Sequence, residues 1–263
     1  MSLSARDLTI GYDKKVISEH LDLEVPAGRF TAIIGPNACG KSTLLRALSR
    51  LLKPQAGEVL LDGKDINSRP AKEVARRLGL LPQSSIAPDG ISVADLVARG
   101  RFPHQKLIRQ WSAADEAAVV TAMAATGVTD LSGELVDTLS GGQRQRVWVA
   151  MVLAQQTPIV LLDEPTTFLD IAHQIEILEL CVRLNREQST TMVAVLHDLN
   201  QASRYADHLV VMKAGRIVEQ GDPRAVITAE LIEEVFGLGC RIIDDPETGT
   251  PLVIPRSSVV RLT

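Results

Sequence analysis

Residues 35–42 read Gly-Pro-Asn-Ala-Cys-Gly-Lys-Ser, which fits the phosphate-binding pattern GxxxxGK[ST]. The apolar run Phe30–Ile34 precedes this segment, and a helix-compatible run, Thr43–Leu52, follows it. In such a strand–loop–helix unit, backbone N–H groups point inward and the helix N-terminus adds partial positive charge. The pattern alone would also suit a glycine-rich turn, but its context favours a site for a nucleotide polyphosphate.

The motif assigns a separate task to each of two side chains in this loop. Lys41 would reach the β- and γ-phosphates, and the hydroxyl of Ser42 would hold Mg²⁺. The residues expected to contact the nucleotide here are Gly35, Pro36, Asn37, Ala38, Cys39, Gly40, Lys41, Ser42 and Thr43.

About a hundred residues later the chain reads Leu139-Ser140-Gly141-Gly142-Gln143. Ser140 is suited to be the N-cap of a helix, and Gln143 stands three residues on, as in a capping box. A helix start with two glycines and a hydroxyl is a second anion site. An ordinary capped helix would have the same local pattern, so the other motifs of the chain must decide between the two.

With this LSGGQ segment the chain resembles the ABC ATPase family, from about Leu3 to Gly221. The resemblance implies ATP and Mg²⁺ as cofactors. It also implies a head-to-tail sandwich of two copies of the chain. In that sandwich, the signature residues of one copy contact the γ-phosphate of the ATP that the other copy holds. These residues are Ser140, Gly141, Gly142 and Gln143.

Two carboxylates follow the apolar run Ile159–Leu162, which reads as a buried parallel strand. The resemblance implies that Asp163 supports Mg²⁺ and that Glu164 is the general base for the attacking water. Gln83 would touch Mg²⁺ or this water. Because Mg²⁺ keeps most of its waters, Ser42, Gln83 and Asp163 form a sufficient set of protein ligands.

Three further residues match family positions. His197, after the apolar stretch 193–196, matches the histidine near the γ-phosphate, so the catalytic set becomes Glu164, His197 and Gln83. Asp170, in Phe168-Leu169-Asp170, matches the D-loop that crosses the dimer. Tyr12 matches the aromatic residue that stacks on adenine. Each of these residues alone could have a structural role. The order in which all of the motifs occur along the chain is what indicates the family.

Composition excludes several classes of function. The chain has 263 residues, a hydrophobic content of 45% and a net charge of −4 with a pI near 5.8. An acidic balance argues against nucleic acid held on a basic face. Three cysteines lack metal-ligand spacing, which is typical of a reducing compartment. We find no signal peptide and no run of eighteen apolar residues, so a transport pore is expected on another polypeptide.

The spacing of apolar residues predicts an α/β fold of the P-loop type, with a mostly parallel sheet, an antiparallel β part and an inserted helical part. Antiparallel strands are expected at Leu3–Ile10 and Leu21–Val25, and central strands at Phe30–Ile34, Leu78–Leu81, Ile159–Leu162 and Met192–Leu196. Helices are expected at Ser92–Arg99, Ala113–Thr126, Gly141–Gln155 and Ala229–Phe236, and strand pairs around residues 213–215 and 245–249. One domain is expected, with residues 1–83 and 156–221 as its core, 84–155 as the helical part and 222–263 as a C-terminal extension.

Among members of this family, a lone cassette without coiled coils or membrane helices is typical of a bacterial importer. Residues 97–105, 143–155 and 166–174 look like those of ferric-siderophore importer ATPases. The resemblance implies a polytopic permease docked near Gln83 to Gln105 and a periplasmic or surface binding protein reached indirectly. It also implies a peripheral position on the cytoplasmic face of the inner membrane. Cassettes for vitamin B12 or haem, and a non-transport ATPase acting on soluble partners, remain alternatives. Arg99–Gln105 could instead be a solvated loop.

Overall fold

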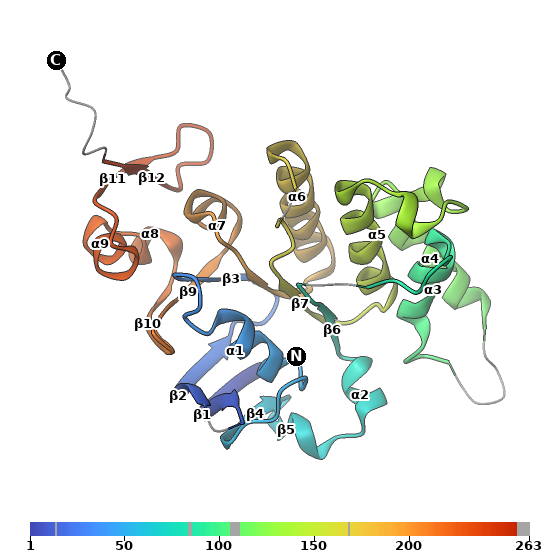
Figure 1. Cartoon of the computed structure of the whole chain (residues 1–263), viewed down its shortest axis with the longest axis horizontal. Helices are drawn as coiled ribbons and strands as arrows, with labels where there is room; N and C mark the ends of the chain where they lie inside the picture. Colours follow the sequence, from blue (N-terminus) through green and yellow to red (C-terminus); the bar gives the residue numbers. More distant parts are fainter. Residues whose placement is uncertain (14, 84–85, 106–110, 168, 257–263) are drawn as a thin grey trace.

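The structure is a computed structural model that describes residues 1–13, 15–83, 86–105, 111–167 and 169–256 (Figure 1). Its strands are β1 (Leu3–Tyr12), β2 (Lys15–Val25), β3 (Phe30–Ile34), β4 (Ala56–Leu61), β5 (Lys64–Asp65), β6 (Leu78–Leu81), β7 (Ile159–Asp163), β8 (Thr191–Val195), β9 (His208–Lys213), β10 (Arg216–Gly221), β11 (Cys240–Asp244) and β12 (Pro251–Pro255). Its α-helices are α1 (Lys41–Leu48), α2 (Ala71–Ala75), α3 (Val93–Ala98), α4 (Ala113–Ala125), α5 (Gly141–Ala154), α6 (Ile171–Gln188), α7 (Leu199–Tyr205), α8 (Pro223–Val226) and α9 (Ala229–Phe236). Phe168, part of the predicted D-loop, lies outside the described residues.

The centre of the molecule is a six-stranded sheet with the order β10-β9-β3-β8-β7-β6. Strands β9, β3, β8, β7 and β6 run parallel, and β10 returns antiparallel to β9. Parallel strands need crossover connections, and helices of the intervening segments supply them. The predicted mostly parallel sheet is therefore confirmed, and its four predicted central strands are β3, β6, β7 and β8.

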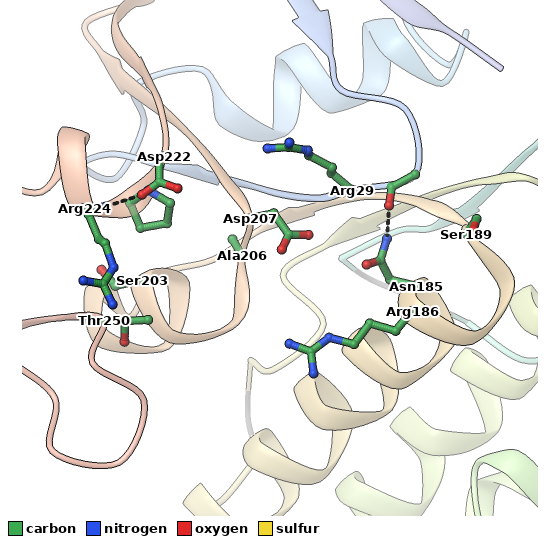
Figure 2. A pocket seen from close by; sticks show the side chains of 12 residues that line it. Arg29, Asn185, Arg186, Ser189, Ser203, Ala206, Asp207, Asp222, Arg224 and Thr250 are labelled. Carbon is green, nitrogen blue, oxygen red and sulfur yellow. Dashed lines mark hydrogen bonds between the residues drawn. The ribbon is translucent and has the colours of Figure 1, made fainter.

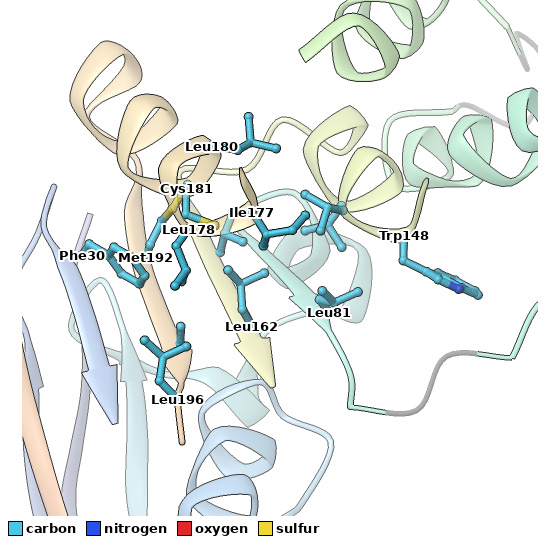
Figure 3. Packing of buried hydrophobic residues seen from close by; sticks show 14 of the residues in the cluster. Phe30, Leu81, Trp148, Leu162, Ile177, Leu178, Leu180, Cys181, Met192 and Leu196 are labelled. Carbon is cyan, nitrogen blue, oxygen red and sulfur yellow. The ribbon is translucent and has the colours of Figure 1, made fainter. Parts of the chain in front are cut away.

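Alternate residues of these strands enter two separate cores, because successive side chains of a strand point to opposite faces. On one face, Phe30, Leu162 and Met192 pack with α6 residues such as Ile177 and Cys181 (Figure 3). On the other face, a second cluster joins the intervening strand residues to α1 and to β1, β2 and β4. With both faces buried, the central strands read as continuous apolar runs.

The second core is closed by a four-stranded antiparallel sheet with the order β2-β1-β4-β5. The pairing of β1 with β2 confirms the predicted antiparallel strands, although both are longer than expected. Strands β4 and β5 were not predicted. The first residues of β4 do not alternate between apolar and polar, so the strand has no clear sequence pattern. Strand β4 also pairs with β1, whose residues lie about fifty positions earlier, and a local pattern does not show such a contact.

Helices α3, α4 and α5 pack on one another at one end of the molecule, beside β6 and β7 (Figure 1). The predicted helices in this segment, near residues 92–99, 113–126 and 141–155, are confirmed within a residue or two. The helix predicted at Ala229–Phe236 and the strand pairs around residues 213–215 and 245–249 are also confirmed. Among the described residues, no helix is both long and apolar enough to cross a membrane.

A buried ion pair ties the helical end together. Arg101 donates from Nε to Asp115 Oδ1 at 2.8 Å and from Nη1 to the carbonyl of Ala154 at 2.7 Å. Both charged side chains are less than a tenth exposed. The hydroxyl of Ser112 also donates to Asp115, and its hydrogen bond, followed by the one from Arg101, holds the pKa of Asp115 below its usual range despite burial.

Replacing Arg101 by Met should therefore lower the free energy of unfolding by about 3–5 kcal/mol, because it leaves the Asp115 carboxylate buried without its cation. Urea unfolding followed by circular dichroism measures the change. The matched control is Arg99→Met, since Arg99 is exposed and should shift stability by less than about 0.5 kcal/mol. Equal stability of the two variants would show that the ion pair does not hold α4 against α5.

The three cysteines, Cys39, Cys181 and Cys240, are all buried and unpaired. Burial raises the pKa of each thiol, to about 12 for Cys181, which lies inside the core between the sheet and α6 (Figure 3). At neutral pH these side chains are therefore protonated, and they pack as small apolar groups.

Candidate functional site

The phosphate-loop segment connects β3 to α1 in a conformation that its glycines permit. Gly35 has φ +153°, and a Cβ there would lie 2.2 Å from the carbonyl oxygen of Met212 on β9. Gly40 has φ +105° and is the N-cap of α1, which begins at Lys41. No side chain caps this helix, and no acidic residue lies in its first turn. Its first N–H groups therefore remain free to bind an anion.

Lys41 is almost completely buried, and its ammonium group folds back onto the loop. Nζ donates to the carbonyl of Gly35 at 2.8 Å and to that of Pro36 at 2.9 Å. An ammonium group has three donors, so these two bonds hold the charge at the centre of the loop with one donor left. The loop is thus held in a cradle shape by the side chain that the motif assigns to the phosphates.

Ser42 and Asp163 meet where α1 begins and β7 ends. Ser42 Oγ donates to Asp163 Oδ1 at 2.8 Å, and Asp163 is only 3% exposed. Burial raises the pKa of Asp163, while the hydrogen bond from Ser42 opposes that shift. A buried carboxylate with a raised pKa is a place where a cation would be favourable.

The residues present fit Mg²⁺. They offer hydroxyl, carboxylate and amide oxygens from Ser42, Asp163 and Gln83, which are the hard ligands that this ion prefers. Within the described part of the chain, no three His, Cys, Asp or Glu side chains form a metal-binding group. An ion held by few protein oxygens, with water and phosphate completing its shell, agrees with that arrangement.

Glu164 follows the end of β7 and has φ +54°, a backbone conformation that non-glycine residues rarely adopt and that is frequent at functional sites. Three side chains surround its carboxylate. Gln83 Nε2 donates to Oε2 at 2.8 Å, Thr167 Oγ1 donates to the same oxygen at 3.1 Å, and His197 Nε2 lies 2.8 Å from Oε1. The structure thus brings together the three residues predicted to be catalytic, Glu164, His197 and Gln83.

These contacts determine the charge of Glu164. Burial alone would raise the pKa of its carboxyl group. The hydrogen bond and charge of His197, together with the bonds from Thr167 and Gln83, outweigh burial and lower the pKa. Glu164 is therefore ionised at neutral pH, as a base must be. The Thr167 contact was not predicted, because nothing in the sequence pattern distinguishes Thr167 from Thr166.

A hollow of 600 Å³ opens over the phosphate loop. It is lined by Asn37, Ala38, Cys39, Gly40, Lys41, Ser42, Thr43, Gln83, Glu164 and His197, all of them predicted, and by Lys15 and Ile17. The last two were missed, because they come from the start of β2, which only the folded sheet brings beside the loop. A volume of this size is within the usual range for a small-molecule site.

Tyr12 does not line this hollow. The residue is 42% exposed, and its hydroxyl accepts a hydrogen bond from Arg46 Nη1 at 3.0 Å. Arg46 lies on α1, so Tyr12 stands at the edge of the phosphate-loop unit, on the strand that precedes Lys15 and Ile17. Its predicted contact with adenine stays a prediction.

The signature residues lie apart from the hollow. Ser140 is the N-cap of α5 and forms the predicted capping box: its Oγ accepts from Gln143 N at 3.3 Å, and Gln143 Oε1 accepts from Ser140 N at 3.0 Å. Asp170 is the N-cap of α6. Among the residues that line the phosphate-loop hollow there is none from 139–143 and none from the start of α6.

A different hollow, of 510 Å³, lies between the central sheet and the C-terminal segment (Figure 2). The residues that line it include Arg29, Arg186, Asp207 and Arg224. It contains none of the residues predicted from the sequence to contact nucleotide, and the phosphate loop does not line it. A hollow of comparable size thus lies apart from the residues predicted to bind nucleotide.

The parallel sheet, the phosphate loop and the ionised Glu164 beside it define a P-loop nucleotide hydrolase. A family model described as ABC transporter matches residues 18–167. The chain belongs to the ABC transporter family and is an ATP-binding, ATP-hydrolysing member of it.

Two relatives show how far the similarity extends. The ferric enterobactin transport ATP-binding protein of Escherichia coli (strain K12) is 61% identical over 253 residues, which are 96% of this chain and 93% of that protein. The achromobactin transport ATP-binding protein of Dickeya dadantii (strain 3937) is 51% identical over 254 residues, or 97% of this chain and 94% of that protein.

Two solved structures resemble the chain. One, described as a metal-chelate type ABC transporter in an inward-facing conformation, has a TM-score of 0.84 and 27% identity and covers 98% of both chains. The other is a dimeric ATP-binding cassette in a post-hydrolysis state with ADP and phosphate bound. It has a TM-score of 0.73 and 27% identity, covering 84% of this chain and 98% of that chain.

Proposed function

We propose that this chain hydrolyses ATP to power the import of ferric siderophores, as one subunit of a bacterial importer on the cytoplasmic face of the inner membrane. The observation that carries this proposal is the 61% identity, over 96% of the chain, to a protein named for ferric enterobactin transport. The aligned 253 residues include the phosphate loop, the signature segment and the helical part, and so both the ATP site and the segment that would meet a permease.

In this proposal the phosphate loop and Lys41 bind the triphosphate of ATP, and Tyr12 contacts the adenine. Ser42, with Asp163 and Gln83, would hold Mg²⁺, which supplies positive charge against the phosphate oxygens. Glu164 takes the proton of the water that attacks the γ-phosphate. His197, 2.8 Å from the Glu164 carboxylate, orients that base. Of these groups, the Glu164 carboxylate is the one placed and charged to accept a proton.

The signature segment supports a sandwich of two copies of the chain. Ser140, Gly141, Gly142 and Gln143 offer a capped helix start suited to an anion, yet they lie apart from the hollow of their own chain. A second copy placed head to tail would bring them to its phosphate loop. Asp170 at the start of α6 would lie along the same interface. The solved cassette with ADP and phosphate is described as dimeric.

We also propose that the domain divides as its sequence predicts, with residues 1–83 and 156–221 as the core, 84–155 as the helical part and 222–263 as a C-terminal extension. The packing of α3, α4 and α5 on one another supports the helical part. The last seven residues of the extension lie outside the described ones.

The segment from Gln83 to Gln105 would receive the permease, with residues 84–85 outside the described ones. The C-terminal end of this segment is fixed to the rest of the protein by two hydrogen bonds. Arg76 Nε donates to Pro103 O at 2.7 Å, and His104 Nε2 lies 2.8 Å from Gln155 O. These contacts disfavour a freely solvated loop. Gln83, at the other end, bonds to Glu164, so docking and catalysis share one side chain.

Arg101 is not part of the docking surface that its position in the sequence suggested. Arg101 is 5% exposed and forms an ion pair with Asp115. Reversing its charge would therefore disrupt the fold rather than test docking. Between residues 99 and 105 the exposed side chains are Arg99 and Phe102, the latter 57% exposed, and nearer to Gln83 the side chain of Ile86 is 89% exposed. A docking test must use these positions.

Reversing the charge of Arg99 should reduce uptake of iron supplied as ferric enterobactin by about tenfold, equivalent to roughly 1.4 kcal/mol of lost docking energy. ATP hydrolysis by the isolated subunit should stay within a few-fold, because Arg99 lies outside the hollow. The matched control is Arg241→Glu, an exposed arginine on β11 at the opposite end of the molecule (Figure 1). Uptake and membrane association are measured in cells that lack the native copy.

Uptake measurements in the same cells test whether the transported substrate is a ferric siderophore. Cells without this subunit should lose uptake of ferric siderophores and regain it when the wild-type chain is supplied, with ferric hydroxamate and haemin as comparison substrates. Unchanged siderophore uptake without the subunit would overturn the proposed function. Normal uptake and association in the Arg99→Glu variant would move the docking surface elsewhere.

A further inference from the structure

The two stretches proposed to serve the opposite copy's ATP meet within one chain at a single side chain. The signature segment begins α5, and Asp170 begins α6. His173, in the first turn of α6, touches both of these starts. The contacts on its two sides are different in kind, one polar and one steric.

The polar side is a pair of bonds to Asp170. Asp170 Oδ1 accepts the backbone N–H of His173 at 3.0 Å and lies 2.7 Å from Nδ1 of its ring. These two bonds lower the pKa of Asp170, so its carboxylate is ionised and the ring nitrogen must be the donor. The D-loop residue therefore fixes the direction of the imidazole ring.

The steric side is the signature glycine. A Cβ added at Gly142 would lie 3.2 Å from Cδ2 and 3.3 Å from Cγ of His173, closer than most carbon contacts allow. Glycine at this position lets the ring lie directly against the start of α5. The ring therefore fills the gap between the first turns of the two helices.

Contacts that involve neither His173 nor Asp170 also hold α5 in place. Arg146 Nη1 lies 2.9 Å from Glu176 Oε2, one turn further along both helices. Gln145 Nε2 donates to Pro165 O at 2.9 Å, which ties α5 to the segment between β7 and α6. Loss of His173 alone should therefore loosen the placement of the two starts and leave the helices packed.

We propose that His173 is a positioning residue that sets the signature segment relative to Asp170, and so acts on the ATP held by the opposite copy. The inference rests on the proposed sandwich of two chains. It predicts a defect that appears in the partner's site and leaves the chain's own ATP binding intact.

The first test is a series at residue 173. His173→Ala should lower kcat by about tenfold or more, as a small misplacement of catalytic parts does, with KM for ATP unchanged. His173→Asn should recover most of the rate, because its amide N–H can occupy the place of Nδ1–H. His173→Gln, whose amide reaches the Nε2 position, should not. Glu176→Gln is the matched control for a loosened α5–α6 contact and should stay near wild type.

The second test locates the defect by mixing chains. A His173→Ala chain mixed with a Lys41→Ala chain forms one site from an intact phosphate loop and an intact signature, so activity should exceed that of either variant alone. A heterodimer of wild type with a chain carrying both changes, isolated through a different tag on each chain, should be less active than the heterodimer of the two single variants, because the intact loop then faces the altered signature. The Ser140→Ala chain mixed with Lys41→Ala reports on the sandwich itself.

The outcomes separate the two ideas. If the Ser140→Ala mixture gains no activity, the sandwich is overturned, and the role of His173 falls with it. If that mixture gains activity but the His173→Ala mixture does not, His173 serves its own chain and the inference alone is overturned. Equal rates for the Ala, Asn and Gln variants would likewise overturn it.

Discussion

In the Glu164→Gln variant, ATP hydrolysis is expected to fall by about 10²–10⁴-fold, while ATP binding stays within a few-fold of wild type. Removing a general base costs roughly this much. The amide keeps the size of the carboxylate and can still accept a hydrogen bond from Gln83 or His197, but it cannot take a proton from water. Phosphate release measures the rate, and a fluorescent ATP analogue measures binding.

A trapped nucleotide should also hold the two copies together. With hydrolysis stopped, size-exclusion chromatography of this variant should show a dimer in ATP and a monomer without it. The matched control is Thr167→Val, which removes one hydrogen bond to Glu164 and leaves the base in place. Hydrolysis by the glutamine variant at the wild-type rate would show that another group is the base.

Lys41→Ala should abolish detectable ATP turnover and weaken ATP binding by about 10²–10⁴-fold. In the ATP complex Lys41 is expected to turn its donors from the loop carbonyls to the β- and γ-phosphates. Two such charge-assisted hydrogen bonds, of roughly 1.5–3 kcal/mol each, are then lost in the variant. In the free protein Lys41 also bonds to the carbonyls of Gly35 and Pro36, so the variant loses the contacts that hold the loop in shape. Binding is measured by isothermal calorimetry and turnover by phosphate release.

Lys15→Ala is the matched control, because Lys15 also lines the hollow but comes from β2 and has no place in the motif. Its effect on turnover should be several-fold at most. A thermal melt of both variants separates loss of binding from loss of fold. If Lys41→Ala binds and hydrolyses ATP normally, the phosphate-loop assignment is wrong.

The sequence predicts those parts of the fold that local patterns determine. The central strands are apolar runs because both of their faces are buried, and the capping box of α5 follows from Ser140 and Gln143 alone. The proximity of Ser42 to Asp163, and of Gln83 to Glu164, followed from a family resemblance, and both pairs are in hydrogen-bond contact.

Features that depend on distant contacts were missed or misread. Arg101 lies in the segment expected to receive the permease, yet the fold buries it against Asp115 and the end of α5. Lys15 and Ile17 join the hollow only after β2 pairs with β1. His173 has no signal of its own, because its importance lies in a glycine and a carboxylate that only the packed helices bring to it.

The burial of Cys39, Cys181 and Cys240 has a practical consequence for spectroscopy. The thiolate is the nucleophile that attacks maleimide and thiol-directed nitroxide reagents, so buried, protonated thiols react slowly at neutral pH. A cysteine introduced at the surface can then be labelled in the otherwise native chain. Ile171, 73% exposed beside Asp170, is a suitable position. The distance between two such labels, one on each copy, would follow the approach of the subunits through a cycle of ATP binding and hydrolysis.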